Sequence, residues 1–395
     1  MSEPLHTARP LPWGVYLACS WTWCIGMFLP ALLLRDLGVW SFVAFALPNI
    51  IGAAALAWVM PTPDSSRQML REHRVAVWAF SALTIAFQVY FAAWIGRLLP
   101  TIWGLNLGWA LPVLLILSAI TPGALARRFL VAGFITWALS AAGIVYLLLT
   151  QALPPLATHG TLPSNHLWPM AVVCALGFLL CPYLDATFHR ARIECGGRAT
   201  AAFSLGFGWF FPPMILGTLV ASPLLLTIAS GQAITPGGPL LVFLLLCTGW
   251  QLLYTVRAHA MERPAGKAAA WRVGLALPAA IVAVLTLLAP SLKSTYADLT
   301  LGEIIYRAFM GLYGLVFPAY VLCCMWPVRA RDGLRISTPT AGRVAFWIAA
   351  VAAGAPFYTL AFIHRQTWWA LPGVAVVLVA WLGATASARR TASTH

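Results

Sequence analysis

The residues best suited to binding chemistry lie in two short strings, each inside a long apolar segment. The strings are Gly26-Met27-Phe28-Leu29-Pro30 and Gly177-Phe178-Leu179-Leu180-Cys181-Pro182. Glycine is entropically poor in a helix and proline removes a backbone donor, so both strings predict a helix interruption. Backbone groups freed inside a membrane are tolerated only where protein, water or an ion satisfies them. At such breaks, half-helix N-termini can hold an anionic group and bare carbonyls can hold a cation.

We expect the two strings to face each other near the bilayer midplane and to form one central site. Trp21 and Trp23 flank the first string and are candidates for an aromatic wall, with plain packing as the alternative. Another reading of the strings themselves also stays open, because glycine and proline are common in membrane helices and produce ordinary kinks. The expected substrate-binding residues are Trp23, Gly26, Met27, Pro30, Gly177, Phe178, Cys181, Pro182 and Gln251.

The elements that must position these strings are membrane helices. Of the 395 residues, 61% are hydrophobic and only 9% are charged, whereas about 25% are charged in a typical soluble domain. The formal net charge is +14, but the basic residues lie in short loops between apolar runs. A nucleic-acid surface needs them clustered on one soluble face. We therefore expect a lipid bilayer around this chain and no nucleic-acid partner.

Apolar segments long enough to cross a bilayer occur twelve times. They fall at 13–34, 39–60, 75–97, 104–121, 130–149, 169–187, 199–222, 239–256, 273–290, 304–327, 344–363 and 369–387. About 20 residues of helix span a hydrocarbon core of about 30 Å. The sequence therefore predicts an all-α polytopic membrane protein with twelve transmembrane helices.

The basic residues predict the orientation of these helices. Most of the 24 lysines and arginines fall in alternate loops, beginning with the N-terminal tail. By the positive-inside rule, both termini are cytoplasmic. The first apolar run is as long as a full span, so we expect it to stay as a helix rather than to be cleaved as a signal peptide. The expected location is a bacterial-type inner (plasma) membrane.

The helix count also predicts internal symmetry. Spans one to five and six to ten make two sets of five, and an odd number inserts the second set upside-down relative to the first. This is an inverted repeat, in which the two interrupted helices come first in each set. The expected organisation is an N-terminal tail 1–12, a ten-helix core 13–327 with repeats 13–150 and 169–327, two further helices within 328–387, and a tail 388–395.

Two longer segments resemble the sodium/solute symporter family. Residues 178–203 run FLLCPYLDATFHRARIECGGRATAAF and are similar to the link that follows the sixth core helix of that family. Residues 245–262 run LLCTGWQLLYTVRAHAME and are similar to its eighth core helix, while 19–34 stand where the first should be. The resemblance implies a leucine-transporter-type core of five plus five helices. It also implies alternating-access transport of a small solute.

In that family a sodium ion lies between the broken first helix and hydroxyls of the eighth. Carried over, this implies ion-binding residues Trp23, Gly26, Cys247 and Thr248. The family has a Ser-Thr pair where this chain has Cys247-Thr248, which removes one hard oxygen ligand. Na⁺ is thus the candidate coupling ion and the only cofactor expected. A proton-coupled, sodium-independent or inactive descendant stays open.

Two groups of charged residues are candidate gates. Asp185 and Arg190 lie in the link after the sixth span and could form a cytoplasmic ion-pair cluster, or simply a solvated loop. Glu303 and Arg307 are spaced i, i+4 at the start of the tenth span, so we expect them to pair on one helix face. An outer gate is the functional interpretation of that pair.

Other classes of protein fit less well. A membrane transferase or protease concentrates several acids or histidines, but the stretch 185–197 holds only one aspartate, Asp185, and no HExxH or GxSxG string occurs. We therefore expect no enzyme. No CxxC or His-rich spacing predicts a structural metal. A membrane sensor or scaffold that kept the transporter fold but lost transport is the main alternative, because polar residues within the spans are few.

Overall fold

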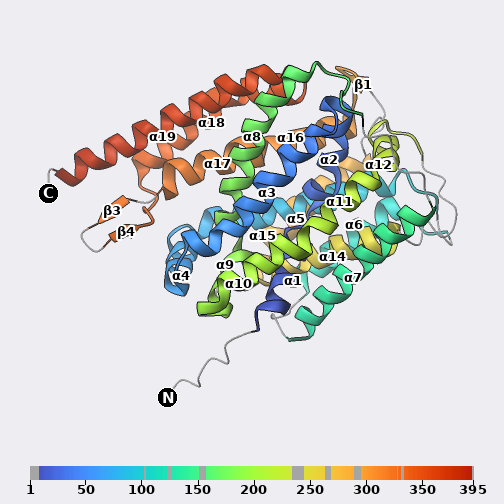
Figure 1. The fold of residues 1–395 in the computed structure, drawn as a ribbon, viewed down its shortest axis with the longest axis horizontal. Coiled ribbons are helices and arrows are strands. Elements are labelled where there is room, and N and C mark those ends of the chain that lie inside the picture. The colour runs from blue at the N-terminus through green and yellow to red at the C-terminus, as the bar shows by residue number, and fades with distance from the viewer. Residues whose placement is uncertain are drawn as a thin grey trace.

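A computed structural model of the chain describes residues 9–101, 104–121, 127–150, 157–233, 244–262, 268–288, 295–326, 328–330 and 333–393. Helices make up most of the described chain (Figure 1). The described strands form two short antiparallel hairpins, Thr295–Tyr296 (β1) with Leu299–Thr300 (β2) and Val328–Ala330 (β3) with Gly333–Arg335 (β4). The prediction of a mainly helical membrane protein is confirmed. The inverted repeat stays a prediction.

Helices lie where the sequence predicts apolar spans. In the first half they are α1 (Pro10–Trp21), α2 (Cys24–Leu37), α3 (Trp40–Val59), α5 (Arg74–Gly96), α6 (Leu107–Ile120) and α7 (Arg127–Thr150), with a polar helix α4 (Pro63–Glu72) between α3 and α5. The second half begins with α8 (Leu167–Leu180), a 3₁₀ turn η2 (Cys181–Leu184), α9 (Ala186–Cys195), α10 (Ala199–Leu205), α11 (Phe211–Val220) and α12 (Ser222–Ala229). Residues 1–8 of the predicted tail and 239–243 of the predicted eighth span lie outside the described residues.

The remaining helices are α14 (Trp250–Met261), α15 (Ala268–Leu288), α16 (Leu301–Gly311), α17 (Phe317–Tyr320), α18 (Ala341–Phe362) and α19 (Ala370–Ser393). Several π-helical turns adjoin the helices of the second half. The π turns are η4 (Gly206–Phe210), η5 (Leu244–Gly249), η6 (Leu312–Val316) and η7 (Val321–Met325). Turns of this kind widen a helix locally and are frequent at functional sites.

Eight of the described helices are long and apolar enough to cross a membrane, and α1 with α2 would add a ninth as one span bent by 57°. α6 is apolar but shorter. The chain is therefore a polytopic membrane protein. The full count of twelve crossings stays a prediction.

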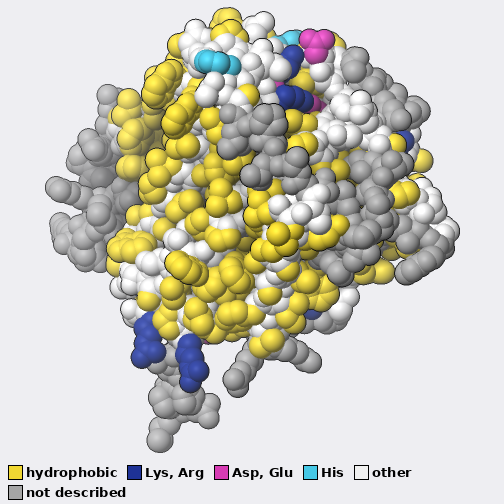
Figure 2. Space-filling model, turned by 45° about the vertical axis from the view of Figure 1, so that its right-hand side comes forward, with side chains coloured by type: hydrophobic (Ala, Val, Ile, Leu, Met, Phe, Trp, Pro, Cys, Tyr) yellow, Lys and Arg dark blue, Asp and Glu magenta, His cyan; other side chains and the backbone are white. Residues whose placement is uncertain are grey.

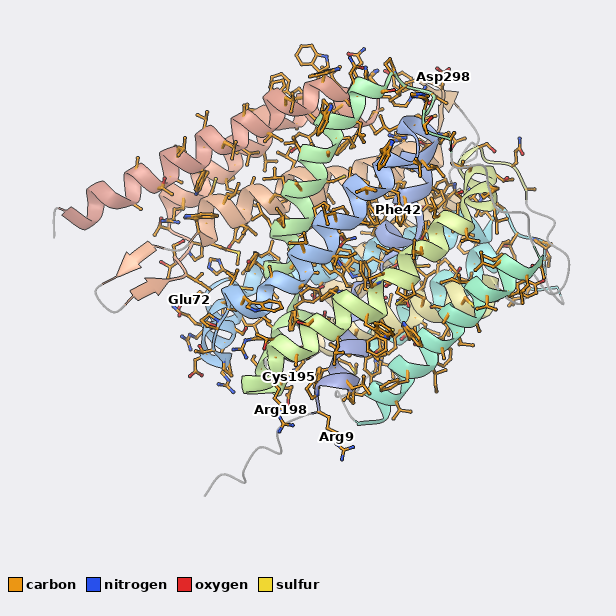
Figure 3. The ribbon with its side chains drawn as sticks, viewed as in Figure 1. Arg9, Phe42, Glu72, Cys195, Arg198 and Asp298 are labelled. Carbon is orange, nitrogen blue, oxygen red and sulfur yellow. The ribbon has the colours of Figure 1, made fainter. Side chains whose placement is uncertain are left out.

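The polar ends of the molecule are separated by an apolar belt. The start of α1, the end of α19, α4 and the β3–β4 hairpin lie toward one end, and β1 and α12 lie at the other (Figure 1). We name these the α4 end and the β1 end. Glu72, Cys195 and Arg198 mark the α4 end, Asp298 marks the β1 end, and Phe42 lies between them (Figure 3). Hydrophobic side chains cover most of the face between the two ends (Figure 2).

Burial divides the helices into an inner and an outer set. In α5 and in the helix 301–325, 72% of the most apolar window is buried, but only 22% in α7 and α18. The first two therefore form the centre of the bundle, and the last two face lipid. A glycine brings α3 against α8, since a Cβ on Gly52 would lie 2.2 Å from the carbonyl oxygen of Phe178. This close packing positions the second predicted string.

Candidate functional site

The first helix is broken earlier than the sequence predicts. α1 ends at Trp21, α2 begins at Cys24, and Trp23 between them is extended, with φ −91° and ψ 177°. The expected interruption at Gly26–Pro30 is wrong, because this string lies within the continuous helix α2. The break itself is real, and it lies at Thr22–Trp23.

A neighbouring hydroxyl explains why Pro30 does not break the helix. Proline lacks the N–H that would bond to the carbonyl four residues earlier, which is that of Gly26. The hydroxyl of Thr218, on α11, donates to this oxygen at 2.8 Å. Because the freed carbonyl is satisfied from a neighbouring helix, α2 continues through the proline.

The carbonyls freed at the actual break are satisfied by α14. The amide nitrogen of Gln251 donates to the carbonyl oxygens of Cys19 at 2.7 Å and Thr22 at 3.0 Å. The hydroxyl of Thr255 lies 3.3 Å from the same two oxygens. The indole of Trp23 donates to the carbonyl of Ser20 at 2.7 Å. A neutral amide therefore stands where bare carbonyls were expected to attract a cation.

The second helix is interrupted just after Pro182. α8 runs to Leu180, the turn η2 follows, and Asp185 is extended and caps α9 by accepting from the N–H of Thr187 at 2.8 Å. Gly177 lies within α8, and a Cβ there would be 3.0 Å from the carbonyl oxygen of Tyr313 in η6. The glycine thus permits close approach of the π turn rather than a break. The thiol of Cys181 donates to the same oxygen at 3.3 Å.

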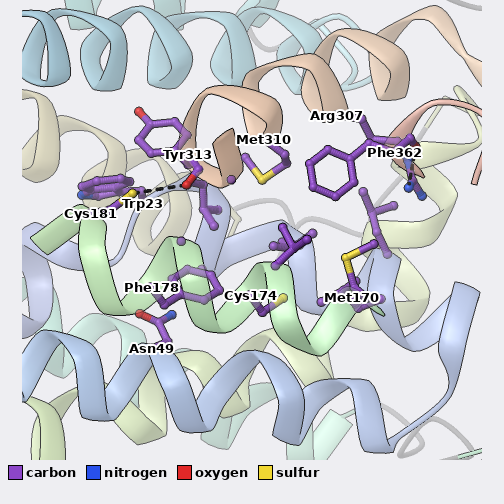
Figure 4. Close-up of a pocket in the computed structure, with 18 of the residues that line it drawn as sticks. Trp23, Asn49, Met170, Cys174, Phe178, Cys181, Arg307, Met310, Tyr313 and Phe362 are labelled. Atoms are coloured by element: carbon purple, nitrogen blue, oxygen red, sulfur yellow. Dashed lines mark hydrogen bonds between the residues drawn. The ribbon is translucent and has the colours of Figure 1, made fainter. Parts of the chain in front are cut away.

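A cavity of about 70 Å³ extends from the two breaks toward the β1 end (Figure 4). Trp23 and Cys181 lie toward one end of it, and Arg307 with Phe362 toward the other. About 10–15 Å³ suffices for one water, so this space admits a small solute group or several waters. Its full lining is Trp21, Trp23, Ile25, Gly26, Leu29, Leu32, Leu33, Asn49, Met170, Val173, Cys174, Gly177, Phe178, Cys181, Arg307, Met310, Tyr313, Gly314 and Phe362.

The cavity brings together part of the expected substrate site. Its lining includes Trp23, Gly26, Gly177, Phe178 and Cys181, which the sequence names for this role. The other four do not line it: Met27 and Gln251 line a separate cavity, and Pro30 and Pro182 are buried within α2 and η2.

Several lining residues carry no distinguishing pattern in the sequence. Met170, Cys174, Met310 and Phe362 read as ordinary apolar positions, and only the packing of α8, α16 and α18 places them here. Asn49 and Tyr313 are detectable as polar groups inside apolar spans. The indole of Trp21 donates to the Asn49 amide oxygen at 2.6 Å, and the phenol of Tyr313 lies 3.0 Å from the hydroxyl of Thr84.

The four residues named for ion binding do not line one cavity. Trp23 and Gly26 belong to the central cavity, whereas Cys247 and Thr248 in η5 line a second cavity of about 100 Å³. The thiol of Cys247 donates to the carbonyl of Leu139 at 3.1 Å. Within the described part of the chain, no group of three or more His, Cys, Asp or Glu is placed to hold a metal ion.

Charged side chains close the β1 end of the cavity. Glu303 and Arg307 pair as the spacing predicts, at 2.8 Å. Arg35 adds a two-point contact with Glu303 at 2.6 and 2.8 Å, and Asp36 binds Arg307 at 2.5 Å. Asp36 and Glu303 side chains are only 5% and 2% exposed. We name Arg35, Asp36, Glu303 and Arg307 the β1-end cluster, which ties the end of α2 to the start of α16.

Aromatic rings close the cavity toward the α4 end. Trp23 packs against Phe80 and against Tyr313, with ring centroids 5.2 Å apart in both pairs. Beyond this layer, Arg190 pairs with Glu262 at 3.1 Å and with Glu194 at 3.5 Å. Burial raises the pKa of the Glu262 carboxyl to about 7, even though Arg190 lies beside it. The carboxyl of Asp185 faces Thr187 and His259 instead.

Comparisons with known proteins give a distant structural likeness. No family model and no curated protein matches this chain. Among solved structures, the chain is similar to Mhp1, a nucleobase-cation-symport-1 family transporter, in a closed conformation with bromovinylhydantoin bound. The two share 13% identity over 97% of this chain and 93% of that one, with a TM-score of 0.42.

Proposed function

We propose that this chain is a secondary active transporter that moves a small solute by alternating access. The observation that carries the proposal is the cavity beside two helix breaks, closed at one end by charged side chains and at the other by aromatic rings. Alternating access needs a central site whose two closures can open separately. Discontinuous helices form such sites in many secondary transporters.

The proposed architecture is the ten-helix core of two inverted repeats, 13–150 and 169–327, followed by two further helices. Two features support it. The breaks lie in the first helix of each proposed repeat, at Thr22–Trp23 and at Cys181–Asp185. Both breaks contribute to the same cavity. On this proposal α18 and α19 follow the ten-helix core, and Phe362 of α18 reaches the cavity from outside it.

The proposed orientation places the α4 end in the cytoplasm of a cell with a bacterial-type inner membrane. The start of α1 and the end of α19 both lie toward this end (Figure 1), which agrees with an even number of crossings. Arg67 and Arg71 on α4 and Arg198 beside α10 also lie here, as the positive-inside rule requires. The β1-end cluster is then the outer gate.

The lining favours a compact, neutral solute with a large apolar or aromatic surface. Trp21, Trp23 and Phe178 offer aromatic faces, and Asn49 offers an amide. Arg307 reaches the cavity, but Asp36 and Glu303 balance its charge and that of Arg35. An anionic solute would therefore gain little from this cluster.

Sodium coupling, which the family resemblance implies, is not part of this proposal. The carbonyls of Cys19 and Thr22 already accept hydrogen bonds from Gln251. A thermal-shift titration with sodium against potassium at constant ionic strength tests for a bound ion, because a ligand of the native state raises its stability. We expect equal curves for the two cations.

Uptake into liposomes tests the transport proposal. Purified protein is reconstituted, exposed to a mixture of small neutral heteroaromatic and aliphatic solutes, and the trapped solutes are identified by mass spectrometry. Cys174→Phe fills the cavity, so we expect it to lower uptake of the transported solute at least about tenfold, which corresponds to about 1.4 kcal/mol. Leu179→Phe is the matched control, because Leu179 lies on the same helix and is 40% exposed.

The two variants separate the possible outcomes. Saturable uptake that Cys174→Phe abolishes and Leu179→Phe preserves supports transport through this cavity. Solute binding in a thermal-shift assay without any uptake would instead indicate a sensor or scaffold that retains the fold. Equal uptake by the two variants would show that the solute does not pass through the cavity.

A further inference from the structure

Two ionisable side chains face each other in the interior, outside the cavity. Asp185 lies at the second break and His259 lies on α14, and both side chains are 0% exposed. The Asp185 Oδ2 and His259 Nε2 atoms are 3.9 Å apart. Within the described residues, neither atom has a hydrogen-bond partner. We propose that Asp185 and His259 together hold one exchangeable proton, and that this proton is the coupling ion.

The second polar atom of each side chain, Asp185 Oδ1 and His259 Nδ1, has a polar neighbour that holds the side chain in place. Asp185 Oδ1 accepts from the N–H and the hydroxyl of Thr187 at 2.8 and 2.7 Å. His259 Nδ1 lies 3.4 Å from the hydroxyl of Ser81, on α5. With Nδ1 as the donor to Ser81, Nε2 carries a lone pair directed at Oδ2. If Oδ2 carries a proton, it can donate that proton to Nε2 once the two side chains move slightly closer. This one hydrogen bond would satisfy both atoms that now lack a partner.

The surroundings favour the protonated, neutral form. A buried carboxylate costs several kcal/mol unless a cation or several donors compensate it. Arg190, on the helix that Asp185 caps, is already paired with Glu262 and Glu194. Ionisable groups that interact electrostatically with Asp185 include Tyr16 on α1, Cys181 in η2, Tyr313 in η6 and Glu262 after α14. None of these four brings a positive charge.

The proton site is linked to both helix breaks and to the cavity. The ring of Trp23, which lines the cavity, packs against His259 with centroids 5.7 Å apart. The hydroxyl oxygen of Thr187 lies 3.2 Å from that of Ser20 on α1. A shift of α1 at the first break therefore moves Trp23 and the surroundings of the proton together. Two ligands that favour the same conformation bind cooperatively, and each raises the affinity for the other by the same factor.

The charge balance of the step is simple. Asp185 and His259 carry one negative charge without the proton and none with it. The proton is taken up from the side to which the site is open, and it leaves to the other side after the conformational change, with no bond to the solute formed or broken. The coupling role rests on the proposed transport function, but proton binding itself can be measured without a solute.

An infrared pH titration of the purified protein tests the site. The titration is made in a Glu262→Gln background, because the buried Glu262 carboxyl, whose pKa is raised to about 7, would give a band of its own. We expect a protonated carboxyl band in this background that disappears on alkaline titration and is absent when Asp185→Asn is added. Asparagine can still cap α9, so the Asp185→Asn variant should fold. His259→Gln should shift the midpoint of the band by about one pH unit or more, as expected for coupled groups. Asp64→Asn, which removes an exposed carboxyl on α4, is the control and should leave this band in place.

Two results would overturn the proposal: a carboxyl band of the Glu262→Gln background that survives Asp185→Asn, or a midpoint that His259→Gln leaves unchanged. If Asp185→Asn does not fold, the His259→Gln titration decides alone. Failure of the transport proposal can be distinguished from failure of the proton site. A titrating Asp185 band in a protein without any solute uptake would refute transport but not the proton site. Uptake without such a band would refute the proton site only.

Discussion

At the scale of single residues, hydrogen-bond partners decide what a buried amide contributes. Gln251 and Gln88 both lie in apolar helices and are 2% and 0% exposed. Gln251 donates to two carbonyls freed by the first break, and its amide nitrogen lies 2.9 Å from the hydroxyl of Thr255. Neither amide atom of Gln88 has a partner among the described residues. The same residue type therefore supports the break in one place and costs desolvation in the other.

Replacing each glutamine by leucine should have opposite effects. Gln251→Leu leaves the carbonyls of Cys19 and Thr22 short of their donor, so we expect stability to fall by about 1–3 kcal/mol. Gln88→Leu removes an unsatisfied amide, so we expect an unchanged or higher stability. Thermal unfolding of both variants in the same detergent measures the difference. Equal destabilisation by the two would show that Gln251 does not support the break.

Glu262 predicts a pH dependence of stability. Its folded-state pKa of about 7 lies above the ordinary value of 4.5 because the carboxyl is buried. Bound protons therefore stabilise the folded state below the unfolded pKa, and this contribution is lost as pH rises through about 7. We expect Glu262→Gln to lose less stability than the wild type between about pH 5 and 8. Parallel unfolding curves across this range would contradict the assignment.

At the scale of elements, the two interrupted helices show that proline and glycine do not by themselves decide where a helix breaks. α2 continues through Pro30 because Thr218 satisfies the carbonyl of Gly26. α1 ends at Trp21, where neither proline nor glycine occurs, because Gln251 and Trp23 satisfy the freed carbonyls. The break therefore lies where neighbouring helices supply donors.

A double-mutant cycle tests this account of α2. Thr218→Val removes the donor to the Gly26 carbonyl, and we expect a loss of about 1–3 kcal/mol in the wild-type background. Pro30→Ala restores a backbone N–H that can bond to the same carbonyl. In that background Thr218→Val should cost clearly less, and the coupling can be read from chemical or thermal unfolding. Additive effects would mean that Thr218 and Pro30 act independently.

At the scale of the whole molecule, the β1-end cluster is the proposed outer gate. It joins α2 to α16 by buried charged hydrogen bonds, so removing one carboxylate leaves two arginines short of a partner. Loss of a buried partner costs more than loss of an exposed one. We therefore expect Glu303→Gln to shift the population toward a state open at the β1 end.

Cys174 reports this shift, since it lines the cavity and is 6% exposed. We expect Glu303→Gln to raise its rate of alkylation by a membrane-impermeant reagent by roughly 5–150-fold, the range of typical coupling energies. Asp64→Asn, which removes the exposed pair with Arg67, should leave the rate unchanged. Cys323 is buried outside the cavity, so its alkylation, measured by mass spectrometry in the same samples, reports unfolding. An unchanged rate in Glu303→Gln would exclude the cluster as a gate.

The sequence by itself determined what depends on local composition and spacing. Apolar runs predicted the positions of the helices and the membrane as their solvent, and the i, i+4 spacing predicted the pair of Glu303 with Arg307. The strings around Gly26 and Gly177 pointed to the two helices that meet at the cavity. The second string overlaps its break at Cys181–Asp185, whereas the first lies beyond its break, within α2. These features hold because hydrophobicity and helical periodicity act over a few residues.

Only the tertiary structure decided which polar groups meet. Gln251 reaches Cys19 across 232 positions, Thr218 reaches Gly26 across 192, and Asp185 meets His259 from a different helix. No local pattern marks such pairs. In an apolar interior a backbone carbonyl must find a donor wherever the fold offers one, so the location of a break is a property of the neighbouring helices as much as of its own residues.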